Sequence, residues 1–238
     1  MKRTLFIAFT AFVGLFGVSQ IAHADTIDPA ENADVTAPFV YVAPAVPVGS
    51  LIAHISFNET GGTVAHDSSS NGNDALVSED AVWAPGMNSD ISGSMNGAIS
   101  FDGTNDRALI LNDIIGTGSA TVCASYNANT LPVNAVLISN SQFSISINQN
   151  GALAVTNDGS HFVTSSSSII PGTWNIICVA RNASGQTTLN INGQLSAQGD
   201  AGVPVIGSSI GIGGHPWYND RGWDGLISDV RIYSGLLI

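Results

Sequence analysis

Basic residues are nearly absent from this sequence of 238 residues. Lys2 is the only lysine, and beyond the N-terminal 24 residues only four arginines stand against eighteen carboxylates, a formal charge of −14. Nucleic acid and anionic lipid are bound by clustered lysine and arginine, so neither is an expected partner. A charge of this sign favours a protein that stays soluble or collects divalent cations.

Long apolar runs are also missing, except at the N-terminus. Two basic residues precede the apolar stretch Leu5–Val18, and Ala22 and Ala24 occupy the small-residue positions of a cleavage site. This pattern predicts a secretory signal peptide at residues 1–24. The fourteen apolar residues are fewer than the ~20 that cross a bilayer. We therefore expect an exported protein (periplasmic, cell-surface or extracellular), with no membrane insertion after cleavage.

Residues 25–50 differ in composition from the rest of the chain. Pro38, Pro44 and Pro47 lie among valine and alanine, and prolines at such short intervals disfavour a central strand and favour an extended tether. We interpret this segment as a linker or N-terminal arm. Residues 51–238 are then expected to form one domain, because about 210 mature residues are within the range of a single all-β domain.

Short segments of alternating apolar and polar residues recur from Leu51 onward, without the 3.6-residue apolar period of a capped helix. The segments 51–57, 142–148 and 187–192 alternate most clearly. Strands with this spacing predict an all-β sandwich of two antiparallel sheets. Asn-Gly or Asp-Gly pairs, which favour hairpin turns, mark the expected strand reversals at 71–72, 96–97, 102–103, 150–151, 158–159, 192–193 and 224–225.

The sequence has two cysteines, Cys123 and Cys178, each within a segment that reads as a buried strand. Two cysteines in an exported protein usually pair, so a disulfide between them is expected. Closing a loop of about 56 residues stabilises a fold by about 4 kcal/mol in the chain-entropy model. Two separate buried thiols are the alternative.

Four segments resemble, in order, the motifs of laminin-G-like domains. Phe101–Asp106 is similar to their F-D-G-x-x-D segment, and Gly225–Tyr233 to their closing G-x-I-x-D-V-R-I-Y strand. Between them, Pro171–Arg181 and Leu189–Gln194 resemble the core G-x-W-x-x-[apolar]-x-[apolar] followed by L-x-[apolar]-N-G. The resemblance runs from Leu51 to Leu237. It implies a jelly-roll sandwich of the laminin-G / concanavalin A-like kind, with two curved antiparallel sheets whose first and last strands pair.

The resemblance also covers the cysteines, because pentraxins, a sister branch, place a disulfide between similar strands. It implies no chemistry by itself, since the fold hosts lectins, adhesion modules, glucanases and spacers. Relatives that hydrolyse glucans use two glutamates around an aspartate on one strand. The mature chain has only Glu31, Glu59 and Glu79, and none of them has this spacing. Its histidines show no zinc-binding spacing either. We therefore expect no enzymatic activity.

The loop 66–74 is rich in the oxygen ligands that calcium prefers. Many laminin-G-like relatives hold a structural calcium near a similar loop and the acid of the last strand. If this carries over, Asp67 and Asp229 are the charged ligands, and Asn73 or backbone carbonyls complete the shell. Ser70 departs from the pattern, since relatives often have glycine there. The alternative is an ordinary turn of Asp, Asn and Ser residues.

The segment 213–224 gathers aromatic rings and charges within a glycine-flanked loop. Trp217 and Tyr218 are candidates for a platform against the C–H face of a sugar. Candidates for hydrogen bonds to its hydroxyls are Asn219, Asp220 and Arg221. Packing of the two rings against a sheet edge is the alternative, and Trp223 is expected in the core.

Taken together, these features predict a secreted or cell-surface, non-catalytic binding or adhesion module. The expected partner is a glycan or another extracellular polymer, or an extracellular protein, and structural calcium is the one cofactor considered. The alternative is a structural or assembly protein of the envelope or extracellular matrix. Residues 25–50 would then pack against neighbouring molecules, and no small ligand would be bound.

Overall fold

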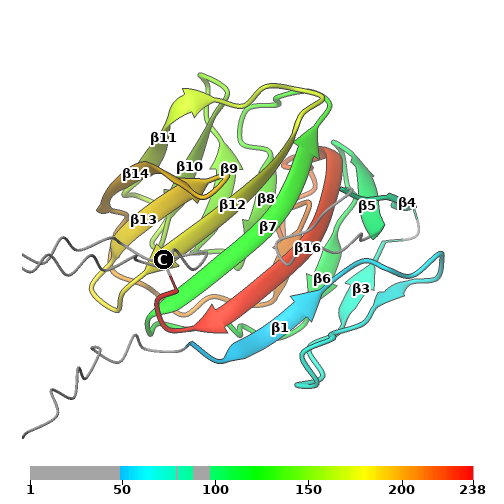
Figure 1. Ribbon diagram of the computed structural model, residues 1–238, viewed down its shortest axis with the longest axis horizontal. Helices are drawn as coiled ribbons and strands as arrows, with labels where there is room; N and C mark the ends of the chain where they lie inside the picture. Colours follow the sequence, from blue (N-terminus) through cyan, green and yellow to red (C-terminus); the bar gives the residue numbers. More distant parts are fainter. Residues whose placement is uncertain (1–48, 79, 88–96, 238) are drawn as a thin grey trace, which may run out of the picture. The chain divides into compact units, whose positions relative to one another are not determined.

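A computed structural model (Figure 1) describes residues 49–78, 80–87 and 97–237. Within these residues there are sixteen β-strands and no α-helix. The strands form two antiparallel sheets of eight strands each, which confirms the predicted all-β sandwich. The predicted signal peptide and residues 25–48 lie outside the described residues. No helix able to span a membrane occurs in the described part of the chain.

Sheet A contains β1 and the last strand, β16. Its strands are β1 (Leu51–Ile55), β4 (Val82–Pro85), β5 (Gly97–Asp102), β7 (Ala120–Ala128), β12 (Trp174–Arg181), β13 (Gln186–Ile191), β14 (Gln194–Asp200) and β16 (Asp224–Ser234). They are hydrogen-bonded in the order β14-β13-β12-β7-β16-β5-β4, and β1 also pairs with β16. The pairing of β1 with β16, side by side in Figure 1, confirms that the first and last strands of the domain are neighbours.

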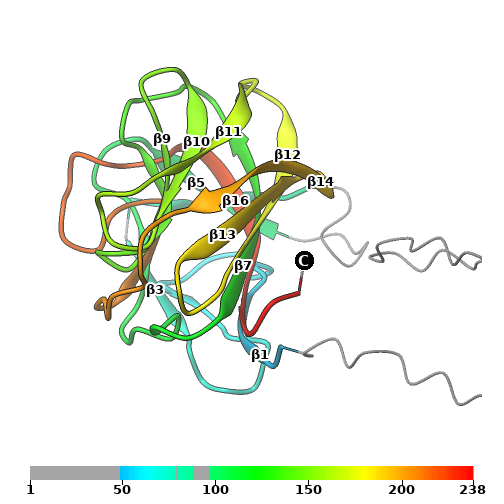
Figure 2. The ribbon, with the colours of Figure 1, turned by 90° about the vertical axis from the view of Figure 1, so that its left-hand side faces the viewer.

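Sheet B carries the remaining strands in the order β11-β10-β9-β8-β15-β6-β3-β2. They are β2 (Val64–Ala65), β3 (Ala75–Val77), β6 (Ala108–Ile110), β8 (Val136–Ser139), β9 (Ser144–Ile147), β10 (Ala152–Thr156), β11 (Val163–Ser168) and β15 (Ile210–Ile212). Figure 2 shows β9, β10 and β11 of this sheet beside β12 and β14 of sheet A at one end of the sandwich.

The core lies between the two sheets, and the alternation of the sequence decides which residues enter it. On β7, Val122, Ala124 and Tyr126 are buried in the core, while the residues between them face the opposite side of sheet A. Trp223, fully buried, meets the Tyr126 ring edge-on at a centroid distance of 5.6 Å. The expected core position of Trp223 is therefore confirmed.

A bulge in β16 lets this strand pair with β5 first and with β1 afterwards. Residues Asp224–Ile227 pair with β5, and Val230–Tyr233 pair with β1. Between them the register with β7 shifts, and Asp229 has a φ of 47°. Aspartate is one of the few residues other than glycine that tolerate this left-handed conformation.

Most of the predicted turn pairs lie in turns, but the pair at 224–225 does not. At Asn192–Gly193 both residues have positive φ and join β13 to β14 through a two-residue hairpin loop. Gly225 lies in β16, so the prediction of a reversal at 224–225 is wrong, and a Cβ there would collide with the Asn127 carbonyl. This glycine permits close backbone approach rather than a turn. The pair at 96–97 stays a prediction, because residue 96 lies outside the described residues and Gly97 is the first residue of β5.

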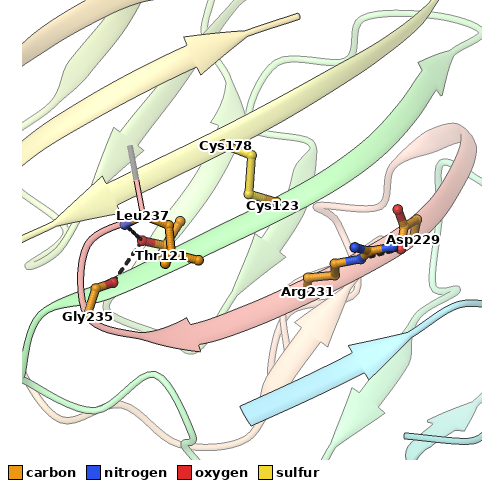
Figure 3. The surroundings of a disulfide bond; sticks show 7 residues. All are labelled: Thr121, Cys123, Cys178, Asp229, Arg231, Gly235 and Leu237. Carbon is orange, nitrogen blue, oxygen red and sulfur yellow. Dashed lines mark hydrogen bonds and ion pairs between the residues drawn. A yellow bond between two sulfur atoms is a disulfide. The ribbon is translucent and has the colours of Figure 1, made fainter. Parts of the chain in front are cut away.

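The disulfide joins two neighbouring inner strands of sheet A. Cys123 on β7 is directly opposite Cys178 on β12, with Cα atoms 4.1 Å apart, and the two form the predicted disulfide. Figure 3 shows the bond between these strands. On the same strand, the Thr121 hydroxyl donates to the Gly235 carbonyl (2.8 Å) and accepts from the Leu237 N–H (3.1 Å). β7 thus carries both the cross-link and the attachment of the C-terminal segment.

Replacing both cysteines with serine should destabilise the domain without changing its fold. The bond closes a loop spanning 55 residues, which corresponds to about 4 kcal/mol in the chain-entropy model. For a domain of this size the Tm should fall by on the order of 10 °C, measured by differential scanning calorimetry. Two free thiols in the denatured, unreduced wild-type protein would contradict this account.

Candidate binding site

The 213–224 loop connects β15 to β16 and is closed at its base by backbone hydrogen bonds. The Gly213 N–H donates to the Leu137 carbonyl (2.9 Å), and the Trp223 N–H donates to the Gly213 carbonyl (2.8 Å). A Cβ at Gly213 would collide with the buried Phe101 ring, so glycine is required there. The buried Trp223 anchors the far end. The loop is therefore held firmly against the sandwich at both ends.

His215 is the inner residue of this loop, with 5% of its surface exposed. Its Nδ1 accepts a hydrogen bond from the Trp217 N–H (3.1 Å), which places the proton of the neutral ring on Nε2. Its carbonyl accepts a hydrogen bond from Arg107 Nη1 (3.0 Å). Burial first, and then the charges of Arg221 and Arg107, lower the pKa of His215 to about 4, against the opposing effect of Asp220. The imidazole is therefore neutral at physiological pH.

Trp217 and Tyr218 project from the loop and expose 68% and 52% of their surfaces. The Trp217 indole N–H donates to the Ser208 hydroxyl (2.7 Å), which fixes the ring while leaving it exposed. The Tyr218 ring lies between the His215 ring, at a centroid distance of 4.5 Å, and the Arg221 guanidinium, whose central carbon is 4.7 Å from its centroid. Both aromatic side chains of the predicted platform are thus exposed and held in place.

The polar candidates of the loop differ in what they contact. Asn219 accepts a hydrogen bond from Arg107 Nη2 (3.1 Å), so its oxygen is used to hold the loop. Asp220 is exposed. Arg221 lies over Tyr218, and its carbonyl accepts a hydrogen bond from the Val136 N–H (3.0 Å) of β8. Arg107 and Ser208 position the loop, but the sequence did not indicate either contact, and Arg107 lies more than 100 residues before the loop.

A hollow of about 120 Å³ lies beside the loop, on the outer side of sheet B. On β9, Ile145 and Ile147 point into the core, so the alternating Ser144 and Ser146 face outward and line the hollow. Phe162, with 53% of its surface exposed, lines it from the β10–β11 connection. Its full lining is Asn134, Val136, Ser139, Ser141, Gln142, Ser144, Ser146, Thr156, Gly159, Phe162, His215 and Arg221. Hydroxyl and amide groups therefore dominate its surface.

The predicted calcium ligands are occupied by donors of the protein itself. The Asp67 carboxylate accepts hydrogen bonds from the N–H groups of His54, Ser69 and Asn73 and from the Ser69 hydroxyl, at 2.8–3.0 Å. Partial burial raises the pKa of Asp67, but these hydrogen bonds lower it by more, so that it lies below the ordinary value. Asn73 donates its side-chain N–H to the Ile52 carbonyl (2.9 Å).

Asp229 contacts the imidazole of His54, whereas Asp67 contacts the backbone N–H of the same residue. Its Oδ1 accepts hydrogen bonds from Arg231 Nε and from His54 Nε2, both at 2.8 Å, and its side chain is fully buried. Figure 3 shows the contact with Arg231. No cluster of three His, Cys, Asp or Glu side chains suited to a metal occurs among the described residues. The calcium site stays a prediction, and an ion would have to displace these hydrogen bonds.

Asp67→Asn should distinguish the role of this carboxylate as a hydrogen-bond acceptor within the protein from its predicted role as a calcium ligand. In the presence of a chelator, the variant should lose about 1–3 kcal/mol of unfolding free energy, because an amide nitrogen cannot accept the hydrogen bonds made to that oxygen. Chemical denaturation with chelator and with calcium measures this. If calcium stabilises the wild type but not the variant, the ion site is supported. Equal stability of variant and wild type in chelator would contradict the role assigned to the hydrogen bonds.

The lowered pKa of His215 predicts how stability changes with pH. The unfolded histidine takes up a proton near pH 6.5, whereas the folded one stays neutral down to about pH 4. Stability should therefore fall as the pH falls through this window, by about 3 kcal/mol for this residue. His215→Asn should lose less stability than the wild type between pH 7 and pH 4.5. Parallel stability curves for the two proteins would be inconsistent with the assignment.

The model of the Laminin_G_3 family, concanavalin A-like lectin/glucanases superfamily, matches residues 102–237, more than half of the chain. The chain belongs to this family. This laminin-G-like assignment confirms the resemblance of the motifs, whereas the likeness to the pentraxin disulfide pattern stays a prediction. No curated protein shows significant sequence similarity to the chain.

Solved structures share the laminin-G-like fold at low sequence identity. Domain 4 of AbnA, an extracellular GH43 arabinanase from Geobacillus stearothermophilus solved with arabinotriose, matches with a TM-score of 0.62 and 19% identity, over 80% of this chain and 95% of that domain. Trypanosoma rangeli sialidase in complex with sialic acid matches with a TM-score of 0.61 and 16% identity, over 82% of this chain and 32% of the sialidase. The binding domain of botulinum neurotoxin serotype D matches with a TM-score of 0.56 and 16% identity, over 79% of this chain and 49% of that one. These likenesses show the fold alone.

Proposed function

We propose that this protein is an exported, non-catalytic binding module that recognises a glycan or another extracellular polymer through the 213–224 loop and the hollow beside it. The observation that carries the proposal is the pair of exposed rings, Trp217 and Tyr218, next to a surface of hydroxyl and amide groups. Sugars offer apolar C–H faces and hydroxyl edges. A site with both aromatic rings and hydrogen-bonding groups matches both features.

The way the rings are held supports binding. The hydrogen bond to Ser208 and the contacts with His215 and Arg221 fix Trp217 and Tyr218 before any ligand arrives. Exposed aromatic side chains that are already ordered lose little conformational entropy on binding. The arabinanase domain solved with arabinotriose supports a saccharide ligand for this fold. The disulfide supports an oxidising, exported location.

The described carboxyl groups support a non-catalytic role. Glu59 accepts a hydrogen bond from the His66 N–H (2.8 Å), away from the hollow. Burial, and then the charge of Asp102, raise the pKa of Asp106, as expected for a proton donor. The Asp106 side chain is 2% exposed, however, so a substrate does not reach it. No carboxylate lines the hollow itself.

A structural or assembly role is the second candidate, because the β14–β15 connection carries exposed apolar side chains. Val203, Val205 and Ile206 are all exposed there. Such residues favour contact with another protein surface. Analytical ultracentrifugation of wild-type protein and a Val203→Ser/Ile206→Ser variant distinguishes this role, since assembly through the connection should be lost in the variant.

Trp217→Ala should weaken glycan binding about tenfold, because stacking on an aromatic ring contributes about 1–2 kcal/mol. The polymer is first identified by screening the mature domain on a glycan array, with and without calcium. Its affinity for the wild type and the variant is then measured by isothermal titration calorimetry. The Tm should change little, since the ring is exposed.

Trp223→Ala is the matched comparison. It should destabilise the domain by about 3–5 kcal/mol, because it empties a core position. If Trp217→Ala unfolds the protein, or if it leaves the affinity for every retained polymer unchanged, the proposed site is wrong. A protein that retains no polymer at all would favour the structural role.

A further inference from the structure

The hollow beside the 213–224 loop contains a single charged side chain, that of Arg221. The other lining residues are neutral, including His215, whose depressed pKa keeps it uncharged. This is unusual for a chain with eighteen carboxylates and one lysine. Burial first, and then the charges of Arg221 and Arg107, lower the pKa of His215, while the charge of Asp220 opposes them. The one charge that lines the hollow among the described residues is therefore positive, on an acidic protein.

Arg221 differs from the other arginines of the domain in what it binds. Arg181 is buried and donates to the carbonyls of Gly116 and Gly118. Arg231 is paired with Asp229, and Arg107 donates to His215 and Asn219. Among the described residues, the Arg221 guanidinium has no hydrogen bond and no ion pair, only the stacking contact with Tyr218. Its charge is thus available to a ligand.

His215 supplies a second donor that lacks a partner. The side chain lines the hollow with 5% of the residue exposed, and its Nδ1 is used by the Trp217 N–H. The protonated Nε2 has no hydrogen-bond partner within the described part of the chain. This N–H is not one of the buried side-chain atoms that lack a partner, so from the lining of the hollow it can donate to an acceptor of a ligand. A ligand that satisfies this donor and Arg221 together carries oxygen acceptors and a negative charge.

We propose that the hollow binds a carboxylate-bearing sugar, in which Arg221 pairs with the carboxylate, His215 donates to a ring or hydroxyl oxygen, and Ser144 and Ser146 bind hydroxyls. This inference rests on the proposed function and adds the class of sugar. Arginine matches a carboxylate with two parallel hydrogen bonds, and such charge-assisted pairs are stronger than neutral ones. The net negative charge of the protein opposes long polyanions, which favours a short acidic saccharide or isolated acidic residues within a neutral chain.

Trigalacturonate and its fully methyl-esterified form provide matched probes, because they share the same sugar chain and differ only at the carboxyl groups, which are charged in the acid and neutral in the ester. Isothermal titration calorimetry at low and high salt should show that wild-type protein binds the acid about tenfold more tightly than the ester at low salt. At high salt, the affinities for the acid and for the ester should differ less, because salt screens the charges. Arg221→Gln should abolish the preference for the acid, and Arg221→Lys should keep part of it. The hydrogen bond from the Val136 N–H involves the backbone of residue 221, so both variants should keep the wild-type Tm.

Two further variants complete the experiment. Asp220→Asn should strengthen binding of the acid, since it removes a negative charge next to Arg221. Leu195→Gln, on exposed β14 of sheet A, is the remote control and should leave both affinities unchanged. Equal binding of acid and ester would overturn the acidic-sugar inference but leave glycan binding intact. An equal loss of affinity for the acid and for the ester in Arg221→Gln would likewise overturn the acidic-sugar inference and leave glycan binding intact. Failure to bind either probe, or any saccharide of the array, would overturn both proposals.

Discussion

The buried carboxylate of Asp229 holds the bulge at which β16 changes partners, and the closure of sheet A depends on this change. On one edge, β16 pairs with β5 before the bulge and with β1 after it. On its other edge, β16 pairs with β7 both before and after the bulge. His54 from β1 and Arg231 from β16 both donate to the carboxylate, so the contact also joins the two ends of the domain. Removing one partner of such a buried group leaves the others uncompensated, which is costly.

The proposed binding surface begins on the same strand. The 213–224 loop leads directly into β16, and Trp223, one residue before it, is packed against Tyr126 of β7. The rest of the proposed surface comes from sheet B, where the outward positions of β9 are serines. Small polar residues line this face, together with larger side chains such as Phe162 and Arg221. Sheet A thus carries the disulfide and the first and last strands, and sheet B carries most of the proposed surface.

The fold was largely predictable from the sequence, because alternation and the ordered motifs depend on local residue types. The disulfide followed from the presence of two cysteines in a protein expected to be exported, and the core position of Trp223 followed from its place before the last strand. The prediction of a turn at 224–225 was wrong, because an Asp-Gly pair serves equally for a turn and for close contact between strands. Only the tertiary structure distinguishes the two uses.

The hollow was not predictable, because alternation shows that Ser144 and Ser146 share a face but not which face borders the loop. Arg107 holds the loop through contacts between residues more than 100 positions apart in sequence. Similarly, the sequence did not show that His54, Arg231 and backbone N–H groups donate hydrogen bonds to Asp67 and Asp229.

The most direct measurement of recognition at this surface is an NMR titration of isotope-labelled protein with the saccharide it retains. Binding at the proposed site should shift the indole N–H resonance of Trp217 and the amide resonances of Ser144 and Ser146. The indole resonance of Trp223, buried in the core, should stay in place. Shifts confined to the outer face of sheet A, around the disulfide, would contradict the account.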